Sequence, residues 1–200
     1  FTSEGVFVSQ WGTEGSGDGE FAYPNGVAVA SDGSVYVSDY DNHRIQKFTS
    51  EGVFVSKWGT QGEGDGEFNE PYGIAVASDG SVYVADWYNH RIQKFTSEGV
   101  FVSKWGTQGE GDGQFSYPTG IVVASDGSVY VTDWYNHRIQ KFTSEGVFVS
   151  QWGTNGTGNG EFQGPIGVAV ASDGSVYVTD LANHRIQKFT SAGVFVSQWG

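Results

Sequence analysis

Short runs of apolar residues alternate with turn-forming residues along the whole chain, and none shows the roughly 3.6-residue apolar period of a helix. Between residues 71 and 105, Val, Ile, Tyr, Phe and Trp gather in four runs, which predict strands at 73–77, 81–86, 91–96 and 100–105. The residues between them, such as Ser78-Asp79-Gly80, favour tight turns. The pattern predicts an all-β fold of short antiparallel strands.

This pattern recurs every 47 residues. Four periods account for residues 1–188, and the last twelve residues repeat the first twelve with Ala192 in place of a glutamate. We name the four strands of each period a, b, c and d. The segment FTSEGVFVS, which leads into strand d, begins at Phe1, Phe48, Phe95 and Phe142 and returns as FTSAGVFVS at Phe189.

Several runs, such as Val82-Tyr83-Val84, are apolar on both sides, which indicates sheets that are covered on both faces. Four-stranded sheets stacked as blades around an axis provide that cover, because each blade packs between two neighbours. We therefore predict a β-propeller domain over 1–200. Its blades span approximately 23–58, 71–105, 118–152 and 165–199, and residues 1–12 form a spare outer strand.

The residues of each blade resemble the NHL repeat. The second blade carries Pro71-x-Gly73-Ile74-Ala75-Val76, then Val82-Tyr83-Val84-Ala85-Asp86, then Asn89-His90-Arg91-Ile92-Gln93-Lys94-Phe95, and the other three blades carry close copies. NHL repeats often have Asp after strand a, where this chain has Ala30, Ala77, Ala124 and Ala171. The resemblance implies a propeller of antiparallel four-stranded blades.

Four sets of strands a, b and c accompany five copies of strand d, at 6–11, 53–58, 100–105, 147–152 and 194–199. Three arrangements fit this surplus: a four-bladed ring with one terminal strand displaced, a homodimer of arcs that closes a larger ring of eight blades, or an excerpt of a longer array. An open arc would expose an apolar blade face, which favours closure or association.

A formal net charge of −13 argues against nucleic acid and anionic membrane surfaces as partners. The loops from strand d to strand a, counted over 12–26, 59–73, 106–120 and 153–167, hold ten Asp or Glu and no Lys or Arg. RNA binding, which the resemblance implies only for NHL propellers with basic faces, is therefore not expected. The chain has no Cys, so cysteine usage assigns no compartment and we make no prediction of localisation.

Residues that could carry chemistry recur once per blade. The four histidines follow Asn and precede Arg, and an identical place in every blade indicates packing and hydrogen bonding rather than metal binding. The same holds for the Asp that closes each strand b. The acidic d-a loops lack the spacing of known calcium loops, and Gly-x-Ser-x-Gly never occurs. We predict no catalytic residue, no metal site and no cofactor.

The blades differ mainly in the d-a and b-c loops, which lie on one face of a propeller because strands alternate in direction. Exposed Trp and Tyr in such loops could stack on a sugar ring or anchor a partner protein. Alternatively they cover the edge of the neighbouring blade. The candidate ligand-binding residues are Tyr40, Trp87, Tyr88, Trp134 and Tyr135 in the b-c turns, and Asn25, Tyr72, Thr119 and Ile166 between the Pro and Gly of strand a.

We therefore expect a non-catalytic binding or scaffolding protein that presents an acidic, aromatic loop face to a protein, a peptide or a glycan. One alternative is a purely structural repeat protein, natural or engineered, without a ligand. A second is a metal-dependent propeller lyase or lactonase, which resembles the activities of some related folds. The last is disfavoured because catalysis needs one asymmetric constellation of groups, whereas near-copies supply fourfold equivalents.

Overall fold

The computed structural model describes all residues from 1 to 200 and contains strands and turns but no helix, so no helix could cross a membrane. A short strand pair near the N-terminus, β1 (Thr13–Glu14) and β2 (Glu20–Phe21), precedes the first blade. The sixteen blade strands are β3 (Pro24–Val29), β4 (Val35–Asp39), β5 (Arg44–Phe48), β6 (Phe54–Trp58), β7 (Pro71–Val76), β8 (Val82–Asp86), β9 (Arg91–Phe95), β10 (Phe101–Trp105), β11 (Pro118–Val123), β12 (Val129–Asp133), β13 (Arg138–Phe142), β14 (Phe148–Trp152), β15 (Pro165–Val170), β16 (Val176–Asp180), β17 (Arg185–Phe189) and β18 (Phe195–Trp199).

The blade strands form four antiparallel four-stranded sheets, each in chain order from the inner strand a to the outer strand d. The predicted all-β fold of four repeated blades is thus confirmed, with small shifts of the boundaries. Strand a of the second blade begins at Pro71 rather than Gly73, because Pro71 still pairs with Asp86 across a register shift that ends at Ile74. Strands b and c pair without interruption from Val82↔Phe95 to Asp86↔Arg91.

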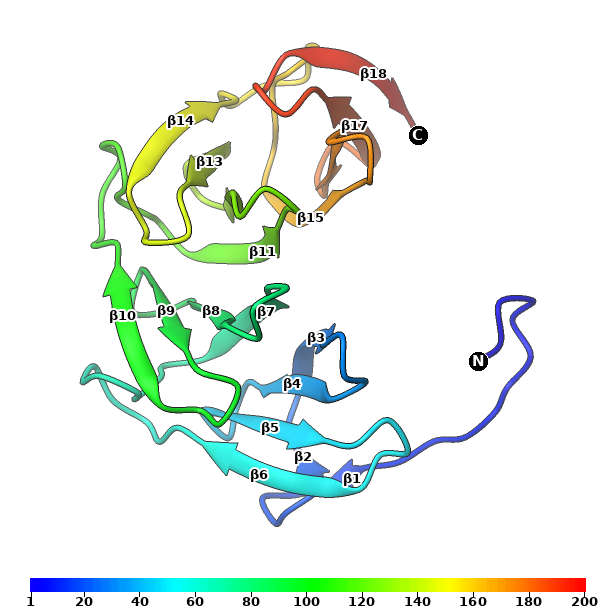
Figure 1. The fold of residues 1–200 in the computed structure, drawn as a ribbon. Helices are drawn as coiled ribbons and strands as arrows, with labels where there is room; N and C mark the ends of the chain where they lie inside the picture. Colours follow the sequence, from blue (N-terminus) through cyan, green and yellow to red (C-terminus); the bar gives the residue numbers. More distant parts are fainter.

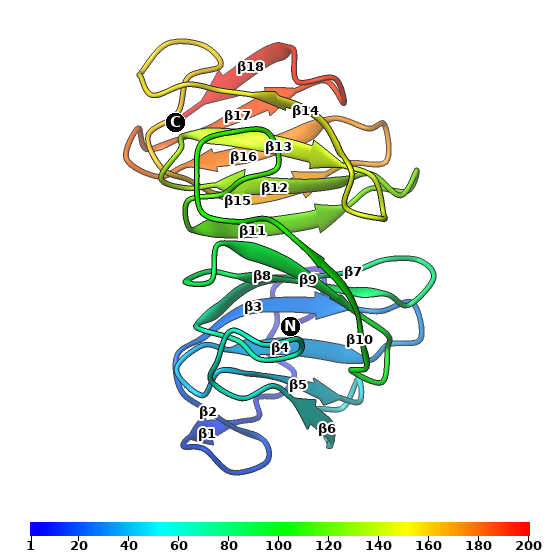
Figure 2. The same cartoon turned by 90° about the vertical axis from the view of Figure 1, so that its left-hand side faces the viewer.

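The four blades form an open arc rather than a closed ring (Figure 1). The inner strands β3, β7, β11 and β15 contact one another in that order along the arc. Blades one and four lie at its two ends, and the view at right angles shows blades one and two stacked below blades three and four (Figure 2). Of the three arrangements that the repeat count allows, a single closed ring of four blades is therefore not the one observed.

The hydrophobic core lies between the blades. One cluster joins Tyr83 and Ile92 of the second blade to Val129 and Val131 of the third, all at most 1% exposed, and the other two joints have matching clusters. This arrangement explains why strand b is apolar on both sides, since each of its faces meets a different neighbour. Blades two and three are therefore covered by a neighbour on both faces, and blades one and four on one face only.

Glycine is required where the inner strands approach most closely. A side chain at Gly73 would collide with the carbonyl oxygen of Thr119 in the next blade, and one at Gly120 would collide with that of Ile166. At Gly167, in the last blade, only atoms of Thr179 in the same blade lie near. The glycine of strand a thus permits backbone contact with the following blade, and blade four has no such neighbour.

Residues 6–11, which the repeat predicts as a spare outer strand, pair with no other strand. The chain reaches blade one from the side of the opening of the arc (Figure 1). Its Trp11 packs against Phe48 of blade one, with ring centroids 4.5 Å apart, and against Phe21 at 6.1 Å. The segment thus lacks a β-sheet partner although its tryptophan is packed.

Candidate functional site

The d-a and b-c loops share one face of the arc, which we call the loop face. A buried Asp at the end of strand b holds these loops in each blade. In blade two, Asp86 accepts hydrogen bonds from the backbone N–H of Asn69 (2.8 Å), from the side chain of Asn89 (3.0 Å) and from Nε of Arg91 (2.7 Å). Burial raises the pKa of Asp86 against the opposing effect of these donors. The predicted structural role of this Asp fits the contacts.

The arginine of this network fastens the acidic d-a loop through its backbone. Arg91 donates to the carbonyl oxygens of Glu63 (2.5 Å), Gly64 (2.8 Å) and Glu67 (2.9 Å). The Glu67 carboxylate accepts from the N–H of Gly64, and Asp65 pairs with Lys104 at 2.7 Å. These carbonyl and carboxylate oxygens of blade two thus have partners within the blade, and no group of three His, Asp or Glu is arranged to hold a metal.

The histidines link one blade to the next. Nδ1 of His43, His90 and His137 accepts, each time at 3.1 Å, the backbone N–H of the residue that precedes the proline of strand a in the following blade. Burial lowers the pKa of His90, while the carboxylates of Asp133 and Asp86 oppose the shift. This inter-blade contact agrees with the structural role predicted for the histidines, and His184 has no following blade to contact.

The residue before that proline adopts a left-handed backbone conformation in every blade. Its φ is 52° at Tyr23, 61° at Glu70 and 60° at Tyr117, and only blade four has a glycine, Gly164 at 70°. Such a conformation is costly for a residue with a side chain, and the histidine bond helps to hold it. As a result, the side chains of Glu70 and Tyr117 reach the loop face.

Aromatic side chains form a continuous row across the loop face of the first three blades. The row links Tyr40 to Tyr72 (centroids 6.1 Å apart) and to Trp87 (6.2 Å), and Trp87 to Tyr117 (4.6 Å). Further contacts join Tyr117 to Tyr88, to Trp134 and to Tyr135. We call Tyr40, Tyr72, Trp87, Tyr88, Tyr117, Trp134 and Tyr135 the aromatic row.

Tyr117 is the member of the row that the sequence interpretation missed. It contacts Trp87, Tyr88, Trp134, Tyr135 and the ring of His90, and so connects the turns of blades two and three. The signal that could have identified it is the variation at the position before the proline, which is occupied by Tyr, Glu, Tyr and Gly in the four blades.

The row has an exposed edge and a packed base. Tyr88 and Tyr135 are 51% and 64% exposed, whereas Trp87 and Trp134 are half-buried. The row ends at blade four, where Leu181 and Ala182 stand in place of the Trp-Tyr pair. The two tryptophans are therefore partly covered by their neighbours, and the two tyrosines keep at least half of their surface exposed.

A pocket of ≈ 540 Å³ opens at the blade-one end of the row, lined by Tyr23, Pro24, Asn25, Tyr40, Asp41 and Tyr72. The hydroxyl of Tyr40 donates to a carboxylate oxygen of Glu70 at 2.6 Å. Burial, followed by this hydrogen bond and the negative charge of Glu70, raises the pKa of Tyr40. The pocket thus combines aromatic walls with the exposed Asn25 and the carboxylate of Asp41.

Three of the candidate residues lie outside the aromatic row, and of these Asn25 lines the pocket at its blade-one end. Thr119 is 3% exposed, and its hydroxyl contacts the Thr132 hydroxyl (2.8 Å) and donates to the Pro165 carbonyl (3.2 Å), which makes it a joint residue that a ligand cannot reach. Ile166 lies in a separate pocket of ≈ 430 Å³ with Leu181, on the free face of blade four. The proposed site is therefore confined to blades one to three.

The NHL repeat pattern matches residues 21–48, 68–95, 115–142 and 162–189, which together make up more than half of the chain. No curated protein matches the chain. Among solved structures, the chain is similar to a catalytically inactive virginiamycin B lyase from Staphylococcus aureus with quinupristin. The identity is 20% and the TM-score 0.69, over 89% of this chain and 55% of the other.

The chain is also similar to hydrazine synthase of Kuenenia stuttgartiensis, with 14% identity and a TM-score of 0.68 over 98% of this chain and 51% of the other. A streptogramin B lyase structure is 17% identical, with a TM-score of 0.60 over 88% of this chain and 68% of that one. The chain thus spans about half the length of the first two matches, and identities this low indicate the fold alone.

Proposed function

The chain belongs to the NHL repeat family, and on that premise we propose that it is a non-catalytic binding propeller whose loop face recognises a protein, a peptide or a glycan. The observation that carries the proposal is the aromatic row, which continues across three blades and keeps Tyr88 and Tyr135 exposed. Exposed tyrosines offer large, stiff contact areas that lose little conformational entropy on binding.

The rigidity of the loops supports the same proposal. Asp86 and Arg91 tie the b-c turn of blade two to its d-a loop, and His90 ties that turn to the next blade. A face that is ordered before binding loses less entropy when a ligand arrives.

The charge of the face favours a ligand rich in hydrogen-bond donors or positive charge. Asp41 and Glu70 lie beside Tyr40, and the whole chain carries a net charge of −13. Lysine and arginine side chains of a peptide, or the hydroxyl groups of a sugar, pair with such carboxylates, and a sugar ring or a guanidinium group stacks on tyrosine. A phosphate backbone would instead be repelled.

A lyase function remains the less favoured alternative. Two of the similar structures are lyases by name, but their identities of 20% and 17% carry no residue over to this chain. The Nδ1 atoms of His43, His90 and His137 already accept backbone hydrogen bonds at the joints. These histidines therefore support the blades rather than form an asymmetric reaction centre.

The test is a binding screen of the whole chain against basic, neutral and acidic peptides and against neutral oligosaccharides, repeated with the Tyr88→Ala/Tyr135→Ala variant. We expect one class to bind the unaltered chain and to bind the variant at least about tenfold more weakly, because two exposed ring contacts are lost. The matched control is Val100→Ala/Val147→Ala, two side chains that are each 61% exposed beside the c-d turns of the same blades.

The two variants separate the possible results. Weaker binding by the tyrosine variant, with unchanged binding by the valine variant, supports the loop face. Equal binding by all three proteins would remove the aromatic row as the site, and a screen without any ligand would favour the purely structural alternative. Salt then distinguishes the ligand classes, since binding of a basic peptide weakens as ionic strength rises and binding of a neutral glycan does not.

A further inference from the structure

The two ends of the arc carry the two halves of a joint between blades. Hydrogen bonds cross the internal joints in a repeated pattern of three contacts. Tyr36 donates its hydroxyl to the carbonyl of Ser97, the Ser38 hydroxyl donates to the carbonyl of Tyr72, and His43 accepts the N–H of Glu70. The joint of blades three and four repeats them with Tyr130, Thr132 and His137. The joint of blades two and three has two of them, through Tyr83 and His90, because Ala85 stands where the other blades have a hydroxyl.

Blade four carries the side chains that make these contacts to a following blade, but no blade follows it. Tyr177, Thr179 and His184 occupy the corresponding positions and make no hydrogen bond to another blade. Thr179 and His184 are exposed and Tyr177 is half-buried, whereas Tyr36, Tyr83 and Tyr130 are each 1% exposed. The polar groups of a joint are therefore in place at this end but unused.

Blade one carries the apolar surface and the backbone groups that would receive these contacts. Val27 and Val29 of the inner strand are 66% and 65% exposed, while Ile74 and Ile121, which correspond to Val27, are 6% and 7% exposed. By the repeat, the carbonyl of Ser50 and the N–H of Tyr23 are the groups that Tyr177 and His184 would meet. An apolar strand face with this pattern of groups is the surface on which a preceding blade packs at every internal joint.

The tryptophans at the ends of the outer strands also show that blade one has the surface on which a preceding blade would pack. Trp58 packs on Phe95 of the next blade (5.8 Å), close to Gly99, where a side chain would overlap its ring. Trp11 occupies the corresponding seat on Phe48, and a side chain at Gly52 would overlap it in the same way. Trp11 therefore occupies on blade one the place of the outer-strand tryptophan of a blade that would precede it.

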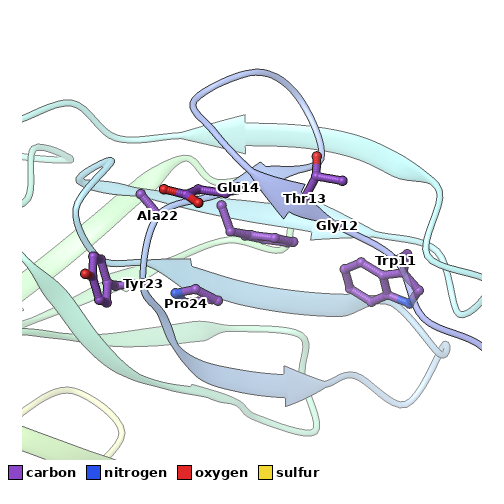
Figure 3. Close-up of a pocket in the computed structure, with 8 residues that line it drawn as sticks. Trp11, Gly12, Thr13, Glu14, Ala22, Tyr23 and Pro24 are labelled. Atoms are coloured by element: carbon purple, nitrogen blue, oxygen red, sulfur yellow. The ribbon is translucent and has the colours of Figure 1, made fainter.

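A pocket lies beside Trp11, at the blade-one end of the arc. It has a volume of ≈ 570 Å³ and is lined by Trp11, Gly12, Thr13, Glu14, Phe21, Ala22, Tyr23 and Pro24 (Figure 3). The ≈ 430 Å³ pocket at the other end contains His184 and Trp199, the groups that the repeat places against a following blade. Each end of the arc thus has a hollow where an internal joint is filled.

We propose that two copies of this chain associate head to tail, with blade four of each packed on blade one of the other, and so close one ring of eight blades. The occupant of each free face is a second copy, because the interface continues the joint that the chain already forms three times. The two faces lie at opposite ends of an open arc and do not meet within one chain (Figure 1). Identical head-to-tail interfaces make a ring when the rotation closes.

The proposal also accounts for the fifth outer strand. Each joint has one tryptophan seat, and both Trp11 and Trp199 of the two copies fit it. The edge of β17, which pairs with β18 through Ile186↔Trp199, has the sequence to accept residues 6–11 of the other copy in the same register. The two segments differ only at Glu4 and Ala192 over their twelve residues. We infer that either segment completes the joint and that the other is displaced.

The first test is the mass of the unaltered chain in solution, by sedimentation equilibrium or light scattering. We expect twice the chain mass of 21.5 kDa. A Val27→Lys substitution, at a side chain that is exposed in the single arc, should return the mass to that of one chain. The matched control, Val55→Lys, alters a valine that is 51% exposed and whose counterparts Val102 and Val149 are equally exposed inside the array, and it should leave the mass doubled.

Each outcome decides the proposal. A single-chain mass for the unaltered protein, or an open-ended series of masses that grows with concentration, would overturn a two-copy ring. A doubled mass that survives Val27→Lys would also overturn it.

A second test uses the tryptophans. Trp11→Ala or Trp199→Ala alone should keep the doubled mass because the other segment fills the seat, and the double variant should lose it; loss in either single variant would overturn the exchange of outer strands.

Discussion

The internal joints and the free face of blade four are built from nearly the same residues in different surroundings. Ile92 is fully buried at the joint of blades two and three, whereas its counterpart Ile186 is only half-buried at the end of the arc. The hydroxyl of Tyr130 has a carbonyl partner across its joint, and that of Tyr177 has none. Identical side chains therefore contribute differently, because in a repeat array the stability of one unit depends on the interface with the next.

The largest expected difference is between the losses of unfolding free energy caused by Ile92→Ala and by Ile186→Ala. Both variants are made in the Val27→Lys chain, so that the end of the arc stays open. Ile92→Ala should lower the free energy of unfolding by about 3 kcal/mol, since the lost methyl groups leave a cavity among packed neighbours. Ile186→Ala should lower it by about 1 kcal/mol or less, because solvent can fill the space. Urea titrations followed by tryptophan fluorescence measure both.

The comparison of the isoleucines also reports on association. In the unaltered protein, a closed ring would bury Ile186, and the cost of Ile186→Ala should then approach that of Ile92→Ala. Equal and small losses at both positions in the Val27→Lys chain would contradict the assignment of the core to the joints. Unequal losses that persist in the unaltered chain would show that the free face stays free.

A smaller difference is expected for the two tyrosine hydroxyls. Tyr130→Phe removes a 3.1 Å hydrogen bond to the carbonyl of Ser191 and should cost about 1 kcal/mol in the Val27→Lys chain. Tyr177→Phe should cost nothing measurable there. Lys141 and Lys188 lie over the two rings at 5.1 Å and 5.4 Å, so the phenyl ring of either variant keeps this contact and the hydroxyl alone is tested. A cost at Tyr177 equal to that at Tyr130 would contradict the comparison.

The blades could be predicted from the sequence because their signals are local and repeated four times. Alternating runs of Val and Tyr, turns such as Ser78-Asp79-Gly80 and the 47-residue period indicate strands whatever lies next to them. The open arc could not be predicted in this way. Closure depends on the rotation between successive blades, and that rotation is set by small differences in packing at the joints. In addition, residues 1–12 are too similar to 189–200 for the sequence to show which segment pairs with β17.

The aromatic row was predicted in part. The b-c turn residues Tyr40, Trp87 and Trp134 vary among the blades and were found, but Tyr117 was missed because its left-handed backbone, at φ 60°, brings its side chain to the loop face only in the folded chain. Thr119 was nominated from its variable position, yet it lies in the joint. The position between Pro and Gly points in a direction that the inner-strand register shift decides, and the sequence does not show that shift.

The smallest expected effect is the pH dependence that His90 gives to the joint of blades two and three. Burial lowers the pKa of His90 below its ordinary value of 6.5, and its Nδ1 accepts the N–H of Tyr117, so the folded joint favours the neutral ring. Because the unfolded chain binds the proton more readily, the contribution of His90 to stability is complete above pH 6.5 and is lost as the pH falls below it. In the Val27→Lys chain, His90→Asn should therefore reduce the loss of unfolding free energy between about pH 8 and about pH 5.5, as measured by urea titration. A loss of the same size in the His90→Asn variant would show that this pH dependence arises outside the joint of blades two and three.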